Sequence, residues 1–423
     1  MIMPAHNLKI RIWLGLDLAD VGTLALQDRR IYFEYASSFL DRGLELSPIH
    51  LPLRAGIHQG APEPPGGLPG VFADSLPDGW GLLLMDRAFR QRGMSRESLT
   101  PLDRLAFLGG RVMGALAYHP PIEKEARATT PIDLDDVAEQ AQRVLEGRAG
   151  EVQASLLCAG TVAAGDRPKV VIGYREADGA MVTGDDKLPA GYRPYIVKFD
   201  ARGDAADGGV VELAYARMAA AAGIRMPPSR VFATPGGGRY FGAERFDRPG
   251  GEQRHVHSLA GLLGADFRFP SLDYEAYLRA TLHLTRDHQE VVEAFRRMVF
   301  NLLACNRDDH ARNFAFLMEP DGTWRLTPAY DLTYSTGPGG EHTMSIAGEA
   351  RAPGRAHLAD LAKKMSIAPA AMGAIVEQVD AAMREWPSFA AETGVAELMM
   401  LEVSERMAKI RPAVLTARRS AAG

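Results

Sequence analysis

One segment constrains the fold of this chain more than any other, because helix, loop and hairpin patterns follow one another within fifty residues. Residues 290–307 read EVVEAFRRMVFNLLACNR, and their apolar positions recur at the spacing of one helical face. Residues 314–318 (FAFLM) then alternate, EPDG turns, and TWRLT returns. We therefore expect an amphipathic helix, a polar loop, a β-hairpin and a second polar loop. The hairpin would bring both loops to one end of a sheet. The apolar stripe of the helix consists of Val291, Phe295, Met298, Val299, Leu302 and Leu303.

The two polar loops carry carboxylates and an amide at a suggestive spacing. Asp308 and Asn313 lie five apart before the hairpin, and Asp331 follows it. Phosphoryl transfer needs one carboxylate to orient the attacking hydroxyl, and a second carboxylate with an amide oxygen to hold Mg²⁺. Protein kinases use Asp-x-x-x-x-Asn followed by an Asp after a hairpin. Asp309 is a rival for the catalytic role, but its offset from Asn313 is four. The alternative is a pair of ordinary polar turns, which Asp and Asn also favour.

Two weaker features precede these loops in the order that a kinase requires. Residues 160–173 (GTVAAGDRPKVVIG) offer a Gly-rich turn, and YIVKF places Lys198 between apolar residues of a strand. A Gly-rich turn alone is usually only a turn, and a lone strand Lys is usually a solvated edge residue. Their order, turn, Lys, helix, polar loop and Asp, favours a nucleotide site.

Patterning along the chain predicts three structural parts. Residues 9–15 and 22–36 indicate antiparallel strands with a turn at Asp28, and HPPIEKEARATTP (residues 119–131) is a Pro-flanked linker. Strand patterns then surround one helix over 211–223, and the text becomes helical from about residue 255. We expect an N-terminal β-rich subdomain at 1–118, a nucleotide-binding lobe at 132–254 and a helical lobe at 255–415.

Composition excludes several classes of function. The formal net charge of −5 gives no basic footprint for autonomous binding to nucleic acid. The two cysteines, Cys158 and Cys305, have no metal-ligand spacing, which suggests free thiols in a reducing cytosol. The N-terminal residues lack a secretory pattern, and no run approaches the ~20 apolar residues that span a bilayer. We therefore expect a cytoplasmic protein without membrane association.

Taken together, these motifs resemble the HipA family, the kinase toxins of bacterial toxin–antitoxin modules, over nearly the whole chain. VGTLALQDRRIYFEY, LPGVFADSLPDGWG and DRLAFLGGRVMGAL are similar to the family's N-terminal subdomain. GTVAAGDRPK resembles its Gly-rich loop, YIVKF its Lys strand, and ERFDR (residues 244–248) its hinge. RDDHARNFAF and LTPAYDLTYS, the most specific matches, resemble its catalytic and metal loops.

The resemblance implies a fold, an activity and partners. The fold would be α+β and protein-kinase-like, related to phosphatidylinositol-kinase-like enzymes. The activity would be transfer of phosphate from Mg²⁺–ATP to a protein Ser or Thr. The family's targets are translation components, including aminoacyl-tRNA synthetases, and phosphorylating one would inhibit growth. A HipB-like helix-turn-helix antitoxin would neutralise the toxin and provide its only, indirect, contact with DNA.

The same resemblance assigns residues. Asp308 would be catalytic, and Asn313 and Asp331 would bind Mg²⁺. Glu244 and Phe246 would meet adenine through the backbone and Asp247 the ribose, while Glu212 would orient Lys198. The full set expected at ATP is Lys198, Glu244, Phe246, Asp247, Gly160, Thr161, Val162, Ala163, Ala164 and Gly165.

One position departs from the family. Its Gly-rich loop commonly carries a Ser, the site of inactivating autophosphorylation, where this chain has Val162. Val162 has no hydroxyl, so this means of control is open to question here. Two other functions also remain open: a kinase-like enzyme acting on a small molecule, and a non-catalytic module that binds an antitoxin. A non-catalytic module has no need to keep a complete set of catalytic residues. The presence of Asp308, Asn313, Asp331 and Lys198 therefore argues against it.

Overall fold

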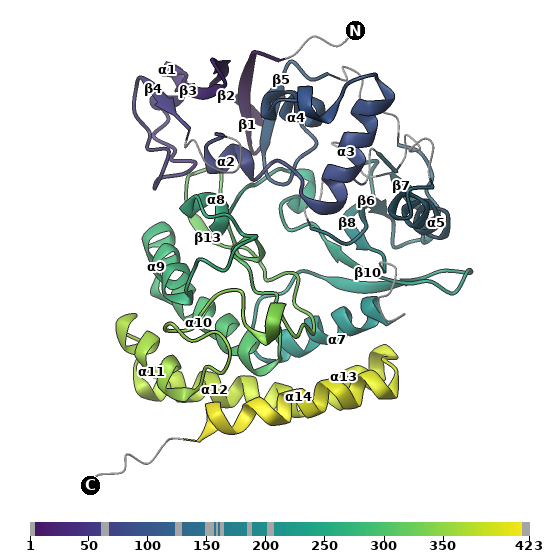
Figure 1. The fold of residues 1–423 in the computed structure, drawn as a ribbon, viewed down its shortest axis with the longest axis vertical. Coiled ribbons are helices and arrows are strands. Elements are labelled where there is room, and N and C mark those ends of the chain that lie inside the picture. The colour runs from purple at the N-terminus through teal and green to yellow at the C-terminus, as the bar shows by residue number, and fades with distance from the viewer. Residues whose placement is uncertain are drawn as a thin grey trace. The chain divides into compact units, whose positions relative to one another are not determined.

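The computed structural model describes residues 5–60, 67–122, 129–148, 156–157, 160, 165–183, 188–200 and 207–416 (Figure 1). The chain divides into two compact units. The first comprises Met1–Gly209, Arg230–Gly264 and Leu317–Thr323, and the second comprises Val210–Ser229, Ala265–Phe316 and Trp324–Gly423. The three predicted parts, 1–118, 132–254 and 255–415, do not coincide with these two units, since residues 210–229 belong to the second and residues 255–264 to the first.

The first unit begins with an antiparallel sheet of strand order β4-β3-β2-β1-β5. Its hairpin turn at Asp28 is as predicted: Asp28 and Arg29 both have positive φ, of 50° and 63°, as the tight turns that match strand twist require. Leu8, Ile10 and Ile12 alternate with more exposed residues along β1 and are buried. The strands are β1 (Asn7–Leu14), β2 (Asp17–Gln27), β3 (Arg30–Tyr35), β4 (Ile57–Gln59) and β5 (Leu116–His119).

Short helices accompany this sheet. In α4, Thr100 and Asp103 form a reciprocal capping box and Pro101 occupies the first turn, so the start of the helix is fixed by local sequence. The apolar side chains Leu84, Met85 and Phe89 of α3 are buried. The elements are α1 (Ser37–Leu40), α2 (Gly70–Ala73), α3 (Gly79–Gln91), η1 (Arg96–Ser98) and α4 (Pro101–Leu108).

A second antiparallel sheet in the first unit has strand order β7-β6-β8-β10-β9. Tyr174, Tyr195 and Phe232 pack edge to face with ring centroids 5.0–5.9 Å apart, and so join β6, β8 and β9 of this sheet. The helical text expected from residue 255 instead begins with a strand, β11. The elements are α5 (Leu134–Leu145), β6 (Lys169–Tyr174), β7 (Met181–Thr183), β8 (Arg193–Lys198), β9 (Ser229–Ala233), β10 (Arg239–Glu244), η2 (Pro249–Gly251), β11 (His255–Ser258) and α8 (Leu259–Leu263).

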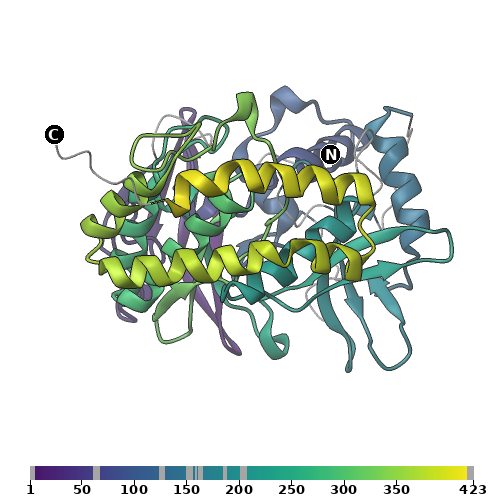
Figure 2. The same cartoon turned by 90° about the horizontal axis from the view of Figure 1, so that it is seen from below.

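The second unit is mainly helical. Helix α10 buries the predicted apolar stripe, and Figure 2 shows α14 running beside α12 and α13. Asp380 of α12 is buried and pairs with Arg411 of α14 at 2.5 Å, which ties these two helices together. The elements are α7 (Gly208–Ala221), α9 (Tyr274–Thr285), α10 (His288–Leu303), η3 (Ala311–Asn313), β12 (Ala315–Met318), β13 (Trp324–Leu326), η4 (Pro338–Gly340), α11 (Arg355–Lys364), α12 (Pro369–Arg384), α13 (Trp386–Thr393) and α14 (Glu397–Leu415).

The architecture is therefore α+β, with antiparallel sheets and a largely separate set of helices. Within the part of the chain that the structure describes, no helix combines the length and the apolar character needed to cross a membrane.

Candidate active site

Helix α10 delivers the chain into the first polar loop through a defined end. Cys305 has a positive φ of 55°, and the N–H of Asn306 donates to the carbonyl of Asn301 at 2.9 Å. This pattern closes the C-terminus of a helix and turns the chain sharply. Asn306 then forms a parallel β-bridge with Ser335, so the backbone ties the start of the first polar loop to the end of the second.

The neighbouring carboxylates of the first loop have opposite environments. Asp308 is exposed, whereas Asp309 is buried with 1% of its surface exposed. The carboxylate of Asp309 accepts hydrogen bonds from Tyr274 Oη and from the N–H of Thr343, each at 2.8 Å, and His342 Nδ1 lies 2.8 Å from it. Asp309 is therefore committed to holding the loop together, which leaves Asp308 as the carboxylate that a substrate can reach.

Asn313 lies in η3, close to Asp308. Its side-chain Nδ2 donates to the backbone carbonyl of Asp308 at 2.8 Å. With Nδ2 so engaged, Oδ1 is the atom of this amide that can coordinate a cation. Tyr330 Oη donates to the carbonyl of Arg312 at 2.8 Å, which links the segment just before Asp331 to the segment just before Asn313.

Asp331 is partly buried and has a positive φ of 54°. A left-handed conformation is uncommon for a residue other than glycine, although Asp is among those that tolerate it. Asp331, Asn313 and Asp309 line one hollow of the second unit, and the structure thus brings the two predicted metal ligands together. An amide oxygen and a carboxylate are ligands that Mg²⁺ prefers, and Mg²⁺ commonly takes its remaining ligands from phosphates and water. Among the described residues, no group of three or more His, Cys, Asp or Glu side chains forms a metal cluster.

The same hollow is also lined by residues that were not predicted from the sequence. Asn301 donates to Tyr274 Oη at 3.0 Å, and Asn306 donates to Asn301 Oδ1 at 3.0 Å. Asn306 Oδ1 is buried and accepts no hydrogen bond within the described residues. Arg297, which is 3% exposed, also lines the hollow. A weak signal was available, since Arg297 and Asn301 lie four residues apart and each directly precedes a residue of the apolar stripe, Met298 and Leu302.

The predicted phosphate-binding elements lie in the first unit. Lys198 ends β8, faces Lys169 of β6 and Phe241 of β10 across the sheet, and places Nζ 5.6 Å from the Phe241 ring centroid. Gly165 has a φ of 116°, which only glycine adopts readily. A side chain at Gly165 would collide with the buried Lys169 Nζ, so Lys169 is a second lysine at this loop. The sequence RPK, which directly follows the turn and ends at Lys169, could have indicated this second lysine.

The other glycine of the described loop has a packing role. A Cβ at Gly160 would lie 2.5 Å from Leu84 Cδ1 and 3.2 Å from Trp80 Nε1, both in α3. Trp80 also donates Nε1 to the carbonyl of Lys169 at 3.0 Å. Gly160 is thus required by close contact with α3, independently of any phosphate. Thr161, Val162, Ala163 and Ala164 lie outside the described residues, and their assignment stays a prediction.

The predicted hinge divides into two environments. Glu244 and Phe246 are partly exposed, and Glu244 lies 3.5 Å from Arg193. Asp247 is wholly buried, pairs with Arg245 and Arg248 at 2.7 Å each, and accepts the N–H of Gly114 at 2.8 Å. A ribose could meet this carboxylate only by displacing those partners. The assignment of Asp247 to ribose therefore does not fit the structure, and its role there is to join the hinge to the N-terminal segment.

Glu212 is buried in α7 and belongs to the second unit, whereas Lys198 belongs to the first. Its predicted role in orienting Lys198 stays a prediction.

Comparison with known proteins supplies the family context. Residues 161–386 match the HipA-like C-terminal domain, and residues 11–119 match the HipA N-terminal domain. Among curated proteins, "Putative kinase Y4dM" of Sinorhizobium fredii (strain NBRC 101917 / NGR234) is 31% identical over 97 residues. This match covers 22% of the chain and 24% of that relative, so the chain spans about a quarter of the curated relative's length.

Solved structures include a match to the whole fold. The HipA protein of Shewanella oneidensis MR-1, from a toxin–antitoxin complex with HipB and operator DNA, has a TM-score of 0.67 and 19% identity, covering 96% of each chain. The Helicobacter pylori proinflammatory kinase CtkA has a TM-score of 0.32 and 11% identity, covering 50% of this chain and 92% of its own. The first likeness confirms the predicted α+β, kinase-like fold class.

Proposed function

Because this chain belongs to the HipA family, we propose that it is a protein kinase that transfers the γ-phosphoryl group of ATP to a Ser or Thr hydroxyl. The observation that carries this proposal is the arrangement around the two polar loops. Asp308 is exposed at the loop where Asn313 is anchored, and Asn313 and Asp331 line one hollow. These are the parts that phosphoryl transfer requires.

The residues of the second unit divide the work. Asp308 accepts the proton of the attacking hydroxyl, because it is the exposed carboxylate of the loop. Asn313 Oδ1 and the carboxylate of Asp331 hold Mg²⁺, which supplies neutralisation of the phosphate charge when bound. Asp309 holds the first polar loop in place through its hydrogen bonds with Tyr274 and Thr343. Three protein groups already contact its carboxylate, which argues against a role in proton transfer.

The first unit contributes nucleotide contacts in this proposal. Lys198 and Lys169 supply positive charge for the phosphates, and the glycine conformation at Gly165 allows the loop backbone to approach them. Backbone groups at Glu244 and Phe246 meet the adenine.

The proposed biological role follows the family. The substrate is a component of translation, with an aminoacyl-tRNA synthetase as the first candidate, and its phosphorylation inhibits growth. The related Shewanella HipA is found with HipB and operator DNA, which supports a helix-turn-helix antitoxin as the partner of this chain.

The first test compares Asp308→Asn with its neighbour Asp309→Asn. With γ-labelled ATP and cell lysate, Asp308→Asn should lower protein phosphorylation by roughly 10²–10⁴, the usual contribution of a positioned acid–base group. Its thermal unfolding midpoint should stay near that of the unchanged protein, because Asp308 is exposed. Asp309→Asn should lower that midpoint, because Tyr274, His342 and Thr343 lose their contacts with a buried charged group.

Three outcomes would count against the proposal. Retained phosphorylation by folded Asp308→Asn would exclude Asp308 as the base. Label found only on a small molecule would favour a small-molecule phosphotransferase. Absence of any transfer or nucleotide binding by the unchanged protein would favour a non-catalytic module.

A further inference from the structure

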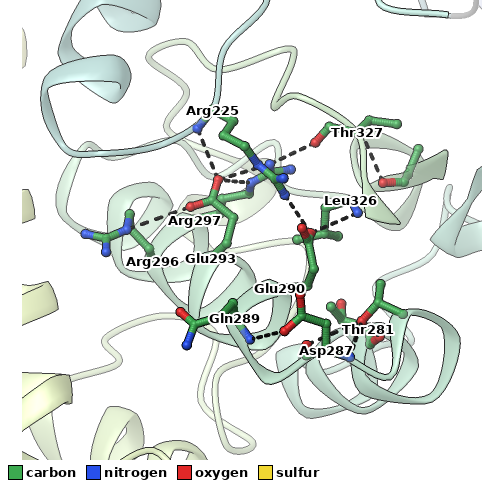
Figure 3. A network of polar contacts seen from close by, with 12 residues as sticks. Arg225, Thr281, Asp287, Gln289, Glu290, Glu293, Arg296, Arg297, Leu326 and Thr327 are labelled. Carbon is green, nitrogen blue, oxygen red and sulfur yellow. Dashed lines mark hydrogen bonds and ion pairs between the residues drawn. The ribbon is translucent and has the colours of Figure 1, made fainter. Parts of the chain in front are cut away.

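Five charged side chains, most of them from α10, contact one another and the backbone of Leu326 and Thr327 (Figure 3). We call them the α10 charge network: Arg225, Glu290, Glu293, Arg296 and Arg297. They comprise three guanidinium groups and two carboxylates, which leaves one excess positive charge. Glu290 and Glu293 have side chains only 12% exposed, and Arg297 only 3%. The Glu293–Arg297 pair is therefore weakly screened by solvent, whereas the side chain of Arg225 is 46% exposed.

Glu290 fixes the strand that precedes Asp331. Its Oε2 accepts the N–H of Leu326, in β13, at 3.0 Å and the guanidinium of Arg225 at 2.6 Å. The carbonyl of Arg225 in turn accepts the N–H of Ala329 at 2.8 Å. The backbone is thus held at two points within five residues of Asp331.

Arg297 fixes the next point along the same segment. Its Nη2 donates to the carbonyl of Thr327 at 2.8 Å, as Figure 3 shows. The same residue lines the hollow that contains Asn313 and Asp331. A buried positive charge therefore forms part of the wall of a cavity that, under the proposed function, must admit a divalent cation.

Glu293 is the residue that compensates this charge. Its Oε1 accepts from Arg297 Nε and from the N–H of Arg225, each at 3.1 Å, and its Oε2 lies 3.8 Å from Arg296 Nε. Removing one partner of such a buried pair leaves an uncompensated charge, which is more costly than the pair itself.

We propose that Glu293 is a positioning residue for the metal–nucleotide site: it holds Arg297 on the Thr327 carbonyl and cancels the charge of Arg297 toward the hollow. This inference rests on the proposed function. It predicts that loss of the Glu293 charge weakens cation binding at Asn313 and Asp331 even though Glu293 does not contact the cation.

The test measures metal binding directly. Mn²⁺ serves as the probe, with a non-hydrolysable ATP analogue, and free Mn²⁺ is quantified by electron paramagnetic resonance. Glu293→Gln should weaken Mn²⁺ binding at least about tenfold, because like charges near a partly buried site interact strongly at an effective dielectric of about 20. With active protein, the Mg²⁺ concentration for half-maximal activity should rise while the rate at saturating Mg²⁺ changes less.

A charge-restoring variant separates electrostatics from folding. Adding Arg297→Gln to Glu293→Gln removes the uncompensated guanidinium together with its hydrogen bond to the Thr327 carbonyl. The double variant should therefore recover the electrostatic part of the lost Mn²⁺ affinity, but not the part that depends on this bond. Asp380→Asn is the matched control, since Asp380 is also buried between two arginines, Arg384 and Arg411, but does not line the hollow. It should lower thermal stability without changing Mn²⁺ affinity.

The outcomes distinguish the two proposals. If the unchanged protein binds no Mn²⁺–nucleotide, the proposed function fails. If it binds and Glu293→Gln binds equally well, the role of Glu293 is wrong. The same conclusion follows if the double variant loses as much affinity as the single one, or if Asp380→Asn causes a similar loss.

Discussion

At the scale of single residues, Asp308 and Asp309 show how far sequence spacing can distinguish a catalytic carboxylate from a structural one. The offset from Asn313 favoured Asp308 over Asp309 as the catalytic residue, and in the structure these two carboxylates differ in exposure. Asp309 is buried and contacts Tyr274, His342 and Thr343, whereas Asp308 is exposed. Burial of this kind depends on Tyr274, His342 and Thr343, which are distant in sequence. No local pattern around residue 309 could have revealed them.

Asp247 illustrates the opposite case, in which a family motif matched but the environment did not. Burial alone would raise the pKa of this carboxyl, but Arg245 and Arg248 outweigh it and lower the pKa from 3.8 to about 2. Its partner Gly114 is 133 residues away, so sequence could not indicate the contact. The motif correctly marked Asp247 as a distinctive residue, but its ion pairs with Arg245 and Arg248 indicate a structural role.

The lowered pKa of Asp247 predicts a pH dependence of stability. A carboxyl whose folded-state pKa lies below its unfolded value stabilises the fold above the unfolded pKa, and this contribution is lost as pH falls through the folded one. Asp247 should therefore contribute on the order of 2 kcal/mol at pH 5, lost between about pH 4 and pH 2. We would measure the free energy of unfolding by urea at pH 5, 4 and 3. It should fall less steeply with decreasing pH in Asp247→Asn than in the unchanged protein. Equal slopes in both proteins would contradict this account.

At the scale of elements, strong periodicity predicted local structure well. The stripe of α10, the turn at Asp28 and the β12–β13 hairpin all appear as predicted. The strand β11 was missed, because HVHS is four residues long and carries two histidines. The β-bridge between Asn306 and Ser335, which joins the two polar loops, has no local signature either. Short strands and bridges depend on partners that sequence periodicity does not identify.

Two helical glycines predict opposite effects of one substitution. A Cβ at Gly70, in α2, would lie 1.9 Å from the carbonyl oxygen of Gly261 in α8, so Gly70→Ala must force two backbones apart. We expect destabilisation of about 1–3 kcal/mol, the usual cost of overpacking. Gly373, inside α12, has its nearest neighbouring atom at 4.0 Å. Gly373→Ala should therefore stabilise by about 0.5–1 kcal/mol, because alanine is the better helix former.

Thermal or urea unfolding of both variants measures these effects on the same protein. If both substitutions change the free energy of unfolding in the same direction, then helix propensity, and not contact between helices, decides the effect of alanine at these positions.

At the scale of the whole molecule, sequence predicted the fold class, while contacts between segments divide the chain at other points than the bounds of the three predicted parts. Residues 210–229 follow the strands of the first unit yet pack with the second, through contacts such as Tyr215 Oη to the carbonyl of Ala304 at 2.6 Å. Residues 317–323 do the reverse. The first of these segments enters the second unit within helix α7, and the other belongs to the β12–β13 hairpin. Both elements are ordinary in composition, so the sequence shows no boundary there.

Whole-molecule charge gives the last prediction, which concerns the proposed partner. With a net charge of −5, the chain has no sequence-wide positive excess to release counterions from DNA phosphates. Gel-shift titrations at physiological salt should show no preference of the chain alone for operator DNA from its own locus over a scrambled duplex. Adding a helix-turn-helix protein encoded beside it should produce a specific complex that contains both proteins. Sequence-specific binding by this chain alone would overturn the view that an antitoxin provides its contact with DNA. A specific complex that always excludes the chain would remove the antitoxin as its partner.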